Sequence, residues 1–513
     1  MKREPGIVDL GTGLFDAVVI GGGITGAGVA LDAATRGLRV ALVEKNDFAY
    51  GTSSRSSKLI HGGLRYLKQL QFGVTFESLR ERERLLRSAP HLVKPLRFIL
   101  PHSASLASSA TYSAGLWLYD TFARADASRR HRHLAADEVR KAYPLLGDVA
   151  GAFEYFDAMA DDCRLVMHVL KKASSLGAVI VNYANVVAFH RRNGAVDEVE
   201  VHDVLADRRL RIRTRAVVNA TGVWADDVRR TLDRDAQPLL QPSKGAHLVI
   251  DNERLPVTDA IAIPKTSTGQ HLFLVPWAGR TLVGTTDTPY DGPVERPTAT
   301  AADMALLLDG VNEAFPSVRL RREDVISVYA GLRPLLSRSG AHESRKAKRD
   351  YMIEQTDNMI TVSGGKLTTY RHMAERVTDL LAPSTKSTTA TLDLFSSREA
   401  PRHLPADISA HLLTAYGSEA AAVAAMPGAD QRMVADLPYT MAEVDYVVRS
   451  EMAMSVSDVL LRRLRLAQTD RGLGHSVVAA VADRIASHYG FGQEWRAETA
   501  RSFRVNMDAF SLG

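Results

Sequence analysis

A glycine-rich turn between two short apolar strands is the feature that most constrains this chain. Residues 17–20 are a run of Ala, Val, Val and Ile, and Gly21, Gly23 and Gly26 follow at once. Residues 27–43 then predict an alanine-rich helix and a second strand. Strand, glycine spacing, helix and second strand together predict a β-α-β unit that binds a dinucleotide.

Each residue of this unit has a physical reason. Gly21 allows the tight turn, Gly23 lets the backbone approach a pyrophosphate, and Gly26 lets the helix pack against the strand. The helix N-terminus offers free N–H groups and a partial positive charge to phosphate. Glu44, at the end of the second strand, can accept hydrogen bonds from a ribose. The motif alone does not distinguish one dinucleotide from another.

Composition limits the other classes of function. The formal net charge of +5 and the pI near 9.1 are no nucleic-acid signature, but they suit anionic substrates or an acidic lipid surface. The single cysteine, Cys163, excludes an internal disulfide and a cysteine metal cluster. Residues 1–5 are not followed by a signal-peptide apolar segment, and no apolar run reaches the roughly 20 residues of a spanning helix. We therefore expect a soluble or peripheral protein in the cytoplasm.

A second motif occupies residues 51–67. Its dense hydroxyls and glycines can wrap phosphate and sugar-alcohol oxygens. The alternative, a solvated serine-rich loop, does not explain His61 and two glycines followed by Arg65 and Tyr66. Residues 76–89 then predict an amphipathic helix whose apolar face carries Phe76, Leu79 and Leu86 and whose charged face is solvated. Residues 103–122 are apolar enough for the core or for a membrane-facing patch, and we favour the core.

The middle of the chain predicts mainly strands. Residues 215–224 form a strand and a glycine turn that return to the nucleotide sheet, and residues 236–330 predict an antiparallel sheet that serves a substrate. Residues 359–371 read as a strand, a Gly-Gly turn and a helix start, which aims a second helix N-terminus at an electron-rich group.

The C-terminal part predicts helices after a linker. Residues 383–405 are rich in Ser, Thr and Pro. Residues 440–468 and 476–489 are the best helices, and Ser455 with Asp458 predicts a capping box. The arginines at 462, 463 and 465 predict an exposed helix face.

Three motifs together resemble the FAD-dependent glycerol-3-phosphate dehydrogenase family, within the glycine/D-amino-acid-oxidase-like flavoproteins. They are residues 52–67, 284–287 and 364–371, and the resemblance is close over residues 16–371. It implies an α/β fold with an α+β substrate domain: an FAD-binding Rossmann-like domain of the glutathione-reductase type, an antiparallel-sheet substrate domain and a C-terminal helical domain. The expected divisions are residues 1–80, 153–235 and 331–382 for FAD, 81–152 and 236–330 for substrate, 383–404 for the linker and 405–513 for the helical domain.

The resemblance also implies the site residues. FAD would be held without a covalent bond, because Cys163 lies outside every motif and no histidyl linkage is implied at His61. A phosphate clamp would consist of Arg333, Arg349 and Lys366, with Arg65 and Tyr66 nearby. The cofactor contacts implied are Gly21, Gly23, Ile24, Thr25, Gly26, Glu44, Lys45, Thr52, Ser53, Ser54, Ser57, Lys58, His61, Gly62, Gly63, Ala220, Thr221, Gly222, Gly365, Lys366, Leu367 and Thr368.

The implied reaction is oxidation of sn-glycerol 3-phosphate to dihydroxyacetone phosphate, with hydride passing from C2 to flavin N5 and electrons going on to quinone. His61 and His247 are candidate bases, while Arg333 could orient the hydroxyl instead. The alternatives are an oxidase of the same substrate that uses oxygen, a flavoenzyme of this fold that acts on an amine or amino acid, and a flavin-binding scaffold.

The expected partners follow from this reaction. They are the substrate and product, a quinone, a membrane surface that the protein meets peripherally from the cytoplasm and, as one possible assembly, a second copy in a homodimer; neither a metal nor a nucleic acid is expected. One departure from the family concerns the membrane. The family's membrane-facing segment often carries basic residues, but residues 98–123 here contain no Lys or Arg. We therefore expect association through apolar contact, with the arginines at 462–465 as the alternative.

Overall fold

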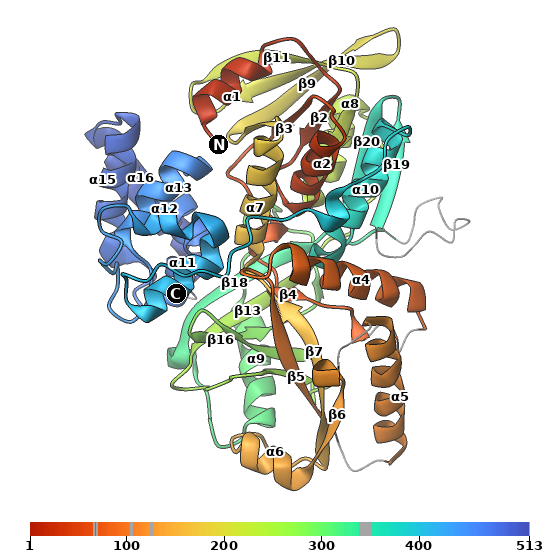
Figure 1. Ribbon diagram of the computed structural model, residues 1–513, viewed down its shortest axis with the longest axis vertical. Coiled ribbons are helices and arrows are strands. Elements are labelled where there is room, and N and C mark those ends of the chain that lie inside the picture. The colour runs from red at the N-terminus through yellow and green to blue at the C-terminus, as the bar shows by residue number, and fades with distance from the viewer. Residues whose placement is uncertain (65–66, 68–69, 103–105, 124–126, 338–350, 512–513) are drawn as a thin grey trace.

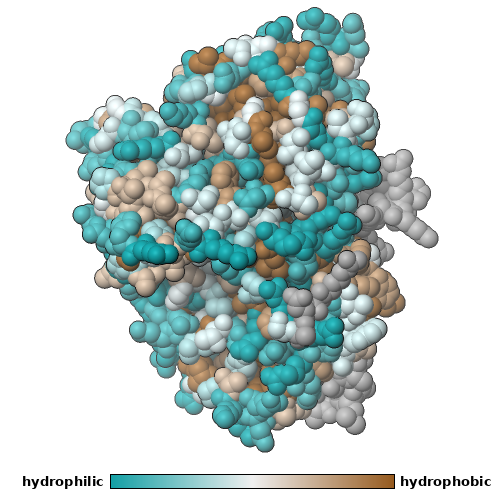
Figure 2. Space-filling model, viewed as in Figure 1, coloured by the Kyte–Doolittle hydropathy of each residue, from teal (hydrophilic) through white to brown (hydrophobic). Residues whose placement is uncertain are grey.

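The computed structural model describes residues 1–64, 67, 70–102, 106–123, 127–337 and 351–511, with side chains from residue 112 onward in the helix that begins at 106. Two sheet regions lie one above the other in Figure 1, and the C-terminal helices lie beside both. The predicted α/β class with a helical C-terminal part is confirmed. The face of the molecule drawn in Figure 2 is mostly hydrophilic, with small, scattered hydrophobic areas.

The dinucleotide sheet is assembled from distant parts of the chain. Its strand order is β19-β20-β12-β2-β3-β8, and every neighbouring pair is parallel except β19 with β20. Helices α2, α7 and α10 share one hydrophobic core with these strands. The elements are β2 (Ala17–Ile20), α2 (Ile24–Thr35), β3 (Val40–Val43), α7 (Asp162–Ser175), β8 (Val179–Val181), β12 (Val217–Asn219), β19 (Tyr351–Thr356), β20 (Met359–Gly364) and α10 (Tyr370–Leu381).

A four-stranded sheet packs against the same strands. Its order is β1-β11-β10-β9, and its apolar side chains form a separate core with those of β2, β3 and β12. A helix that the sequence analysis did not predict, α1, places the buried Arg3 against Asp203. The elements are α1 (Arg3–Leu10), β1 (Leu14–Phe15), β9 (Ala184–Arg192), β10 (Ala195–Asp203), β11 (Arg208–Thr214) and α8 (Ala225–Leu232).

The predicted antiparallel sheet is present and is larger than expected. Ten strands take part; the main path is β17-β13-β16-β15-β14-β5-β7-β4, β18 pairs with β13, and β6 pairs with β7. The β14–β5 pair is parallel. The strands are β4 (Leu59–Ile60), β5 (Lys94–His102), β6 (Arg132–Ala135), β7 (Gly151–Met159), β13 (Ser243–Asp251), β14 (Ala260–Ile263), β15 (Leu272–Trp277), β16 (Arg280–Gly284), β17 (Thr288–Pro289) and β18 (Val325–Arg333). The expected boundaries at 152/153 and 330/331 therefore fall inside β7 and β18, and β4 lies in this sheet although it was assigned to the FAD-binding part.

Among the described residues, four helices accompany this sheet, and the one over Phe72–Ser88, α4, corrects the predicted amphipathic face. In α4, Phe76 is 46% exposed, whereas Glu81 and Arg82 are buried. Glu81 forms an ion pair with Arg371, and Arg82 forms one with Asp157. These two side chains therefore lie in tertiary ion pairs and not on the solvated face that periodicity predicted. The helices are α4 (Phe72–Ser88), α5 (Leu106–Ala123), α6 (Ala136–Ala142) and α9 (Ala301–Ala314).

The C-terminal part is helical, but residues 440–468 are not one helix. Helix α13 ends at Glu451, where the C-cap residue Met452 has a φ of +54°, and a π-helical turn over Asp458–Arg463 follows. The predicted capping box is present, since Ser455 N donates to Asp458 Oδ2 and Asp458 N donates to Ser455 Oγ, both at 3.1 Å. The helices are α11 (Ala406–Tyr416), α12 (Ala420–Ala424), α13 (Met441–Glu451), α14 (Leu466–Thr469), α15 (Val478–Tyr489) and α16 (Gln493–Met507).

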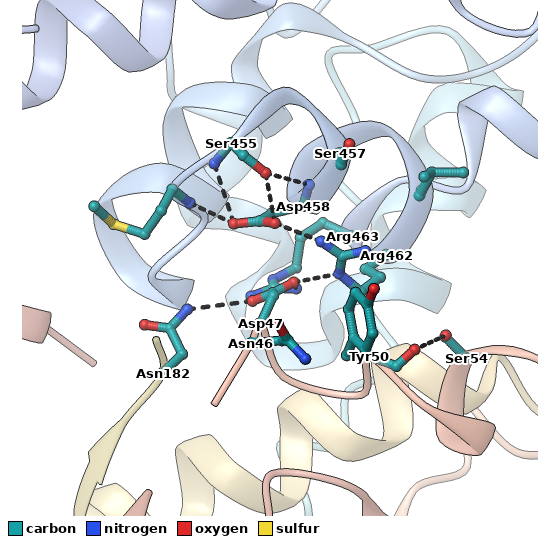
Figure 3. Close-up of polar contacts among 12 residues, drawn as sticks. Asn46, Asp47, Tyr50, Ser54, Asn182, Ser455, Ser457, Asp458, Arg462 and Arg463 are labelled. Atoms are coloured by element: carbon teal, nitrogen blue, oxygen red, sulfur yellow. Dashed lines mark hydrogen bonds and ion pairs between the residues drawn. The ribbon is translucent and has the colours of Figure 1, made fainter. Parts of the chain in front are cut away.

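The prediction that the arginines of this part form an exposed face is wrong. Arg462, Arg463 and Arg465 are at most 8% exposed. Arg462 and Arg463 both bind Asp47 of the dinucleotide part, as Figure 3 shows, and Arg465 binds Asp161. Burial of unpaired charge is costly, so these ion pairs fix the helical part against the cofactor-binding part. They also remove these arginines as a lipid-binding surface.

Candidate functional site

The cavity that collects most of the predicted cofactor contacts, called the main cavity below, lies at the carboxyl ends of β2, β12 and β20, where ligands of such sheets bind. Its volume is about 290 Å³. The predicted cofactor contacts that line it are Gly21, Gly23, Ile24, Thr25, Glu44, Lys45, Thr52, Ser53, Ala220, Thr221, Gly222, Gly365, Lys366 and Leu367. Those that do not line it are Gly26, Ser54, Ser57, Lys58, His61, Gly62, Gly63 and Thr368.

The glycine turn forms one end of the cavity. Gly21 has a φ of +110°, and a Cβ there would lie 2.6 Å from the carbonyl oxygen of Ala220. A Cβ at Gly26 would overlap the carbonyl oxygen of Gly21. Ile24 N donates to Ser53 Oγ at 3.0 Å, so one N–H of the α2 N-terminus already has a partner, and the next residue, Thr25, also lines the cavity. This is a cradle that admits backbone but no side chains.

Glu44 lies at the carboxyl end of β3. Its Oε2 accepts from Gly22 N at 2.7 Å and its Oε1 from Asn46 N at 2.9 Å. Burial raises the pKa of this carboxyl above its ordinary value, and the two N–H donors oppose that shift. Each oxygen keeps a further lone pair, so the carboxylate can still accept from ribose hydroxyls.

Residues 364–368 form the opposite end. Gly364 and Gly365 have φ of +81° and +85°, and Lys366 is the N-cap of the turn that leads into α10. Thr368 Oγ1 accepts from His61 N at 3.1 Å, which joins the second serine- and glycine-rich motif to this turn. The two motifs therefore meet at this hydrogen bond.

Two of the predicted cofactor contacts support the loop instead of lining the cavity. Lys58 is fully buried, and its Nζ lies 2.8 Å from Asp162 Oδ1 and 3.2 Å from Ser54 O. Burial lowers the pKa of Lys58, and the Asp162 carboxylate opposes this. Gly62 N donates to Tyr119 Oη and Asp157, and a Cβ at Gly62 would overlap Leu79. The position of a residue in the sequence motif does not distinguish a side chain that lines the cavity from one that holds the loop in place.

Arg333 and His247 lie on adjacent strands of the large sheet. Ser243 of β13 faces Arg333 of β18, and His247 faces Tyr329. The Arg333 guanidinium pairs with Asp287 at 3.2 Å and donates to Thr285 Oγ1 at 3.1 Å. His247 Nε2 lies 2.8 Å from Ser57 Oγ, and its ring stacks on Tyr329 at 4.8 Å.

His247 is held neutral. Burial lowers its pKa well below the ordinary value, and the charges of Arg333 and Lys58 act in the same direction. Its Nδ1 is buried and has no hydrogen-bond partner in the part of the chain that the structure describes. A neutral imidazole can accept a proton, and here it can do so directly or through Ser57.

Some predicted residues fall elsewhere. Arg65, Tyr66 and Arg349 lie outside the described residues. Cys163 is buried in α7, where burial raises the pKa of its thiol to about 12, and it does not line the cavity. Among the described residues, no group of three or more His, Cys, Asp or Glu side chains is arranged to hold a metal.

The sequence analysis missed one wall of the cavity. Tyr50, Trp224 and Pro334 line it, as do residues 184–186 of β9. The Lys45 ammonium lies 4.4 Å from the Trp224 ring centre, a cation–π contact at the mouth. Trp224 ends the 215–224 strand-and-turn segment, so that motif contained a signal for it, whereas nothing local marks residues 184–186.

Comparisons with known proteins agree with this geometry. A family model described as FAD dependent oxidoreductase matches residues 16–380, and one described as the C-terminal domain of alpha-glycerophosphate oxidase matches residues 354–496. The chain is 36% identical to the aerobic glycerol-3-phosphate dehydrogenase of Staphylococcus saprophyticus over 494 residues, which is 90% of this chain and 89% of that protein. The enzyme of the same name from Staphylococcus aureus is also 36% identical, over 493 residues, 90% of this chain and 88% of that protein.

Solved structures give the same relationship. The glycerol-3-phosphate dehydrogenase of Bacillus halodurans complexed with FAD aligns with a TM-score of 0.82 and 30% identity, and covers 99% of this chain and 97% of that one. The L-alpha-glycerophosphate oxidase of Mycoplasma pneumoniae aligns with a TM-score of 0.59 and 17% identity, covering 74% and 97%, and shares the fold.

Proposed function

This chain belongs to the family of FAD-dependent glycerol-3-phosphate dehydrogenases, and we propose that it oxidises sn-glycerol 3-phosphate to dihydroxyacetone phosphate and passes the electrons to a quinone. The observation that carries the proposal is the two-ended cavity: a glycine cradle and Glu44 at one end, and the Lys366 turn at the other. FAD, when bound, supplies the acceptor for a hydride from C2 of the substrate.

The residues present fit FAD. The turn at Gly21 admits only backbone, the free N–H groups at the start of α2 suit a pyrophosphate, and Glu44 keeps lone pairs for a ribose. Around residues 364–367, backbone N–H groups at the start of a helical turn stabilise negative charge. We expect the FAD to be non-covalent, because Cys163 is buried away from the cavity.

The substrate phosphate would be bound by Lys366 and Arg333, with Arg65, Tyr66 and Arg349 added by resemblance. A dianion in a cleft needs several cationic donors, and Arg supplies paired ones. Asp287, Ser243 and Thr285 hold the Arg333 guanidinium in place, so less side-chain freedom is lost on binding. The proton of the C2 hydroxyl would pass to one of the two histidines, His61 beside the Thr368 turn or His247 beside Arg333.

The membrane contact would be made by α4 and α5. Trp117 is 64% exposed and Phe76 46%, and the rings of Phe76 and Phe122 join the two helices at 5.7 Å. Tyr119 is buried and bonded to Asp157, so it takes no part. Such partial aromatic exposure suits peripheral insertion into an interface. In the part of the chain that the structure describes, every helix is too short or too polar to cross a bilayer.

The parts of the chain would divide as the sequence analysis expected, with the boundaries moved to strand ends. Residues 1–58, 160–235 and 334–382 would bind FAD, 59–159 and 236–333 would bind substrate, and 405–513 would fix the two together. We place the protein in the cytoplasm, at the inner membrane surface, and a homodimer is the assembly to test first.

Anaerobic addition of glycerol 3-phosphate to the yellow holoenzyme tests the reaction. We expect the flavin absorbance to bleach when the substrate is in excess over the enzyme. Re-oxidation of the reduced flavin should be fast with a quinone analogue and slow with oxygen. Glycine and proline serve as controls for the amine-oxidising alternative. Bleaching by an amino acid but not by glycerol 3-phosphate would refute the proposal, and faster re-oxidation by oxygen would replace quinone with oxygen.

A further inference from the structure

A second, smaller cavity lies where the three parts of the chain meet. The loop that lines the main cavity with Thr52, Ser53 and Ser56 contributes Ser54 and Arg55 to this second one. Its volume is about 50 Å³. A buried water needs roughly 10–15 Å³ on this measure, so the space suits about three to five waters or one tetrahedral oxyanion.

Arg55 is the unusual member of this cavity. Its guanidinium makes no hydrogen bond or ion pair with the described residues, and its only recorded contact is with the Tyr50 ring, 5.7 Å away. Burial lowers the pKa of Arg55, and no carboxylate is among the charges that act on it. An arginine remains protonated throughout the physiological range, so Arg55 presents an uncompensated positive charge.

The neighbouring charges do not supply a counter-charge. Arg462 is committed to Asp47 and Asp458, and Arg465 to Asp161 and Asp162. Figure 3 shows Arg462 and its carboxylates beside the ring of Tyr50 and close to Ser54. The charges of these buried arginines are therefore neutralised by their own aspartates. The positive charge of Arg55 is not neutralised by any of them.

Two further side chains point to a ligand. Gln468 is 1% exposed and lines the cavity, and its Oε1 has no hydrogen-bond partner in the described part of the chain. Since amide oxygen and nitrogen are assigned by their partners, the same side chain can present its NH₂ group to an acceptor. Arg296 is exposed at the rim and adds a second cation, which forms no ion pair with the described residues.

We propose that this cavity binds a tetrahedral oxyanion, a phosphate group, held by Arg55 and Arg296 with the amide of Gln468 as a further donor. Buried polar groups are ordinarily satisfied, and such a ligand satisfies both an orphaned amide and an unpaired guanidinium. The occupant joins the cofactor-binding loop to α14 and is distinct from the substrate. The phosphate comes either from free phosphate or a small phosphate ester, or from a lipid headgroup.

Phosphate binding to the FAD-loaded enzyme tests the proposal. Isothermal titration with inorganic phosphate is carried out on the unaltered protein, Arg55→Met, Arg296→Met and the control Arg140→Met, whose arginine is exposed on α6 and pairs with the exposed Asp137. Loss of a charge-assisted hydrogen bond is expected to weaken this site about 10- to 100-fold in Arg55→Met and less in Arg296→Met. The Arg140 variant should bind like the unaltered enzyme.

Because phosphate also competes for the substrate clamp, the titration is repeated in Lys366→Met. The Arg55 site should persist there, and crystals of the holoenzyme soaked in tungstate should show the metal's anomalous signal beside Arg55. Equal phosphate binding by the unaltered enzyme and both Arg55→Met and Arg296→Met would overturn the proposal, as would tungstate only beside Lys366. Arg296 is exposed, so its variant remains informative even where Arg55→Met fails to fold.

Flotation with vesicles of phosphatidylcholine, with and without phosphatidate, separates the two sources. Free phosphate predicts equal flotation of the unaltered enzyme and Arg55→Met, and a lipid headgroup predicts loss in the variant. The flavin-bleaching experiment is independent of this site, so failure of one proposal leaves the other standing.

Discussion

Asp287 holds the guanidinium of Arg333 by an ion pair of 3.2 Å, at the point where β18 leaves the large sheet for the main cavity. Thr285 Oγ1 and Thr286 O accept from the other nitrogen of the same fork at 3.1 and 3.0 Å. The cation is thus oriented by the protein itself. Because the rotamer of Arg333 is already fixed, less side-chain entropy is lost when it binds a phosphate.

Arg333→Ala should damage substrate use far more than flavin binding. Removing one partner of a buried, hydrogen-bonded charge pair costs about 2–5 kcal/mol, which corresponds to a fall of roughly 30- to 4,000-fold in kcat/KM. Steady-state kinetics with glycerol 3-phosphate, beside flavin content, measures it. Asp287→Asn is the control: it keeps the threonine contacts, so its loss should be much smaller. Normal kinetics in Arg333→Ala would remove this residue from the clamp.

The two histidines can be separated by their pH profiles. The variant that loses the base should lower kcat by about 100- to 10,000-fold and abolish the acidic limb of its pH dependence. The other should lower kcat less and keep that limb. His61→Gln and His247→Gln are the variants to compare, with Ser57→Ala to test relay through the 2.8 Å contact with His247. Unchanged profiles in both histidine variants would exclude both as the base.

The same Gly→Ala change should have opposite effects at two helical positions. At Gly26 a Cβ would overlap the Gly21 carbonyl, so the turn must shift and FAD should be lost. At Gly73, in α4, no heavy atom lies within 4 Å of the added carbon, so lower entropy of the unfolded chain should stabilise the protein by about 0.4–1 kcal/mol. Flavin content and thermal midpoint measure the two. Retention of FAD by Gly26→Ala would contradict the packing argument.

Neutralising Asp47 should loosen the cofactor site as well as the fold. Asp47 Oδ1 and Oδ2 each lie 2.8 Å from an Arg463 nitrogen, and both side chains are fully buried. Asp47→Asn removes the carboxylate that Arg462 and Arg463 share and leaves them only Asp458 and Glu451. Breaking a buried ion pair in this way costs about 3–5 kcal/mol. The exposed pair of Asp137 and Arg140 gives the control, Asp137→Asn, with about 0–1 kcal/mol expected. A midpoint unchanged by Asp47→Asn would contradict the role of this pair.

Acid should destabilise the protein through Glu451. Burial alone would raise its pKa, but the charges of Arg164 and Lys171 outweigh this and hold it at about 2. Because the folded pKa lies below the ordinary 4.5, the stabilisation is present above pH 4.5 and is lost as pH falls towards 2. The contribution is about 3 kcal/mol. Glu451→Gln should be less stable than the unaltered protein at neutral pH, and its thermal midpoint should fall less steeply between pH 4.5 and 2. Parallel curves of midpoint against pH for the two proteins would contradict this role of Glu451.

Much of the dinucleotide-binding part could be predicted because its signals are local. Glycines mark the two turns because both need backbone conformations with positive φ, which glycine adopts readily. Glu44 is marked by its place at the end of the second strand. The antiparallel sheet follows from alternation. Each of these depends on neighbours within a few residues.

The rest could not be predicted, because it depends on partners far along the chain. Nothing near Lys58 indicates that Asp162 will neutralise it, and nothing near Arg463 indicates Asp47. A run of arginines in a helical sequence ordinarily predicts a solvated face, and only tertiary structure reverses that. Glu81 and Arg82 in α4 are buried for the same reason.

Membrane association should survive salt and yield to mild detergent. The three arginines at 462–465 are committed to internal carboxylates, so attraction to anionic lipid by them is not available. Flotation with liposomes at low and high salt, using Trp117→Glu against the control Val204→Glu, measures the contribution of the exposed Trp117. Equal flotation of both variants, or complete release by salt, would contradict apolar contact through α5.

Asp47 and Arg463 are synthesised at very different times during translation. The two residues are 416 positions apart, and a ribosome adds about 5–20 residues per second, so the aspartate emerges roughly 20–80 seconds before its partner. During that interval the loop after β3 carries a carboxylate destined for burial, and it must stay hydrated. The cofactor cradle therefore cannot reach its final form until nearly the whole chain has left the ribosome, and truncated products should neither retain flavin nor escape proteolysis.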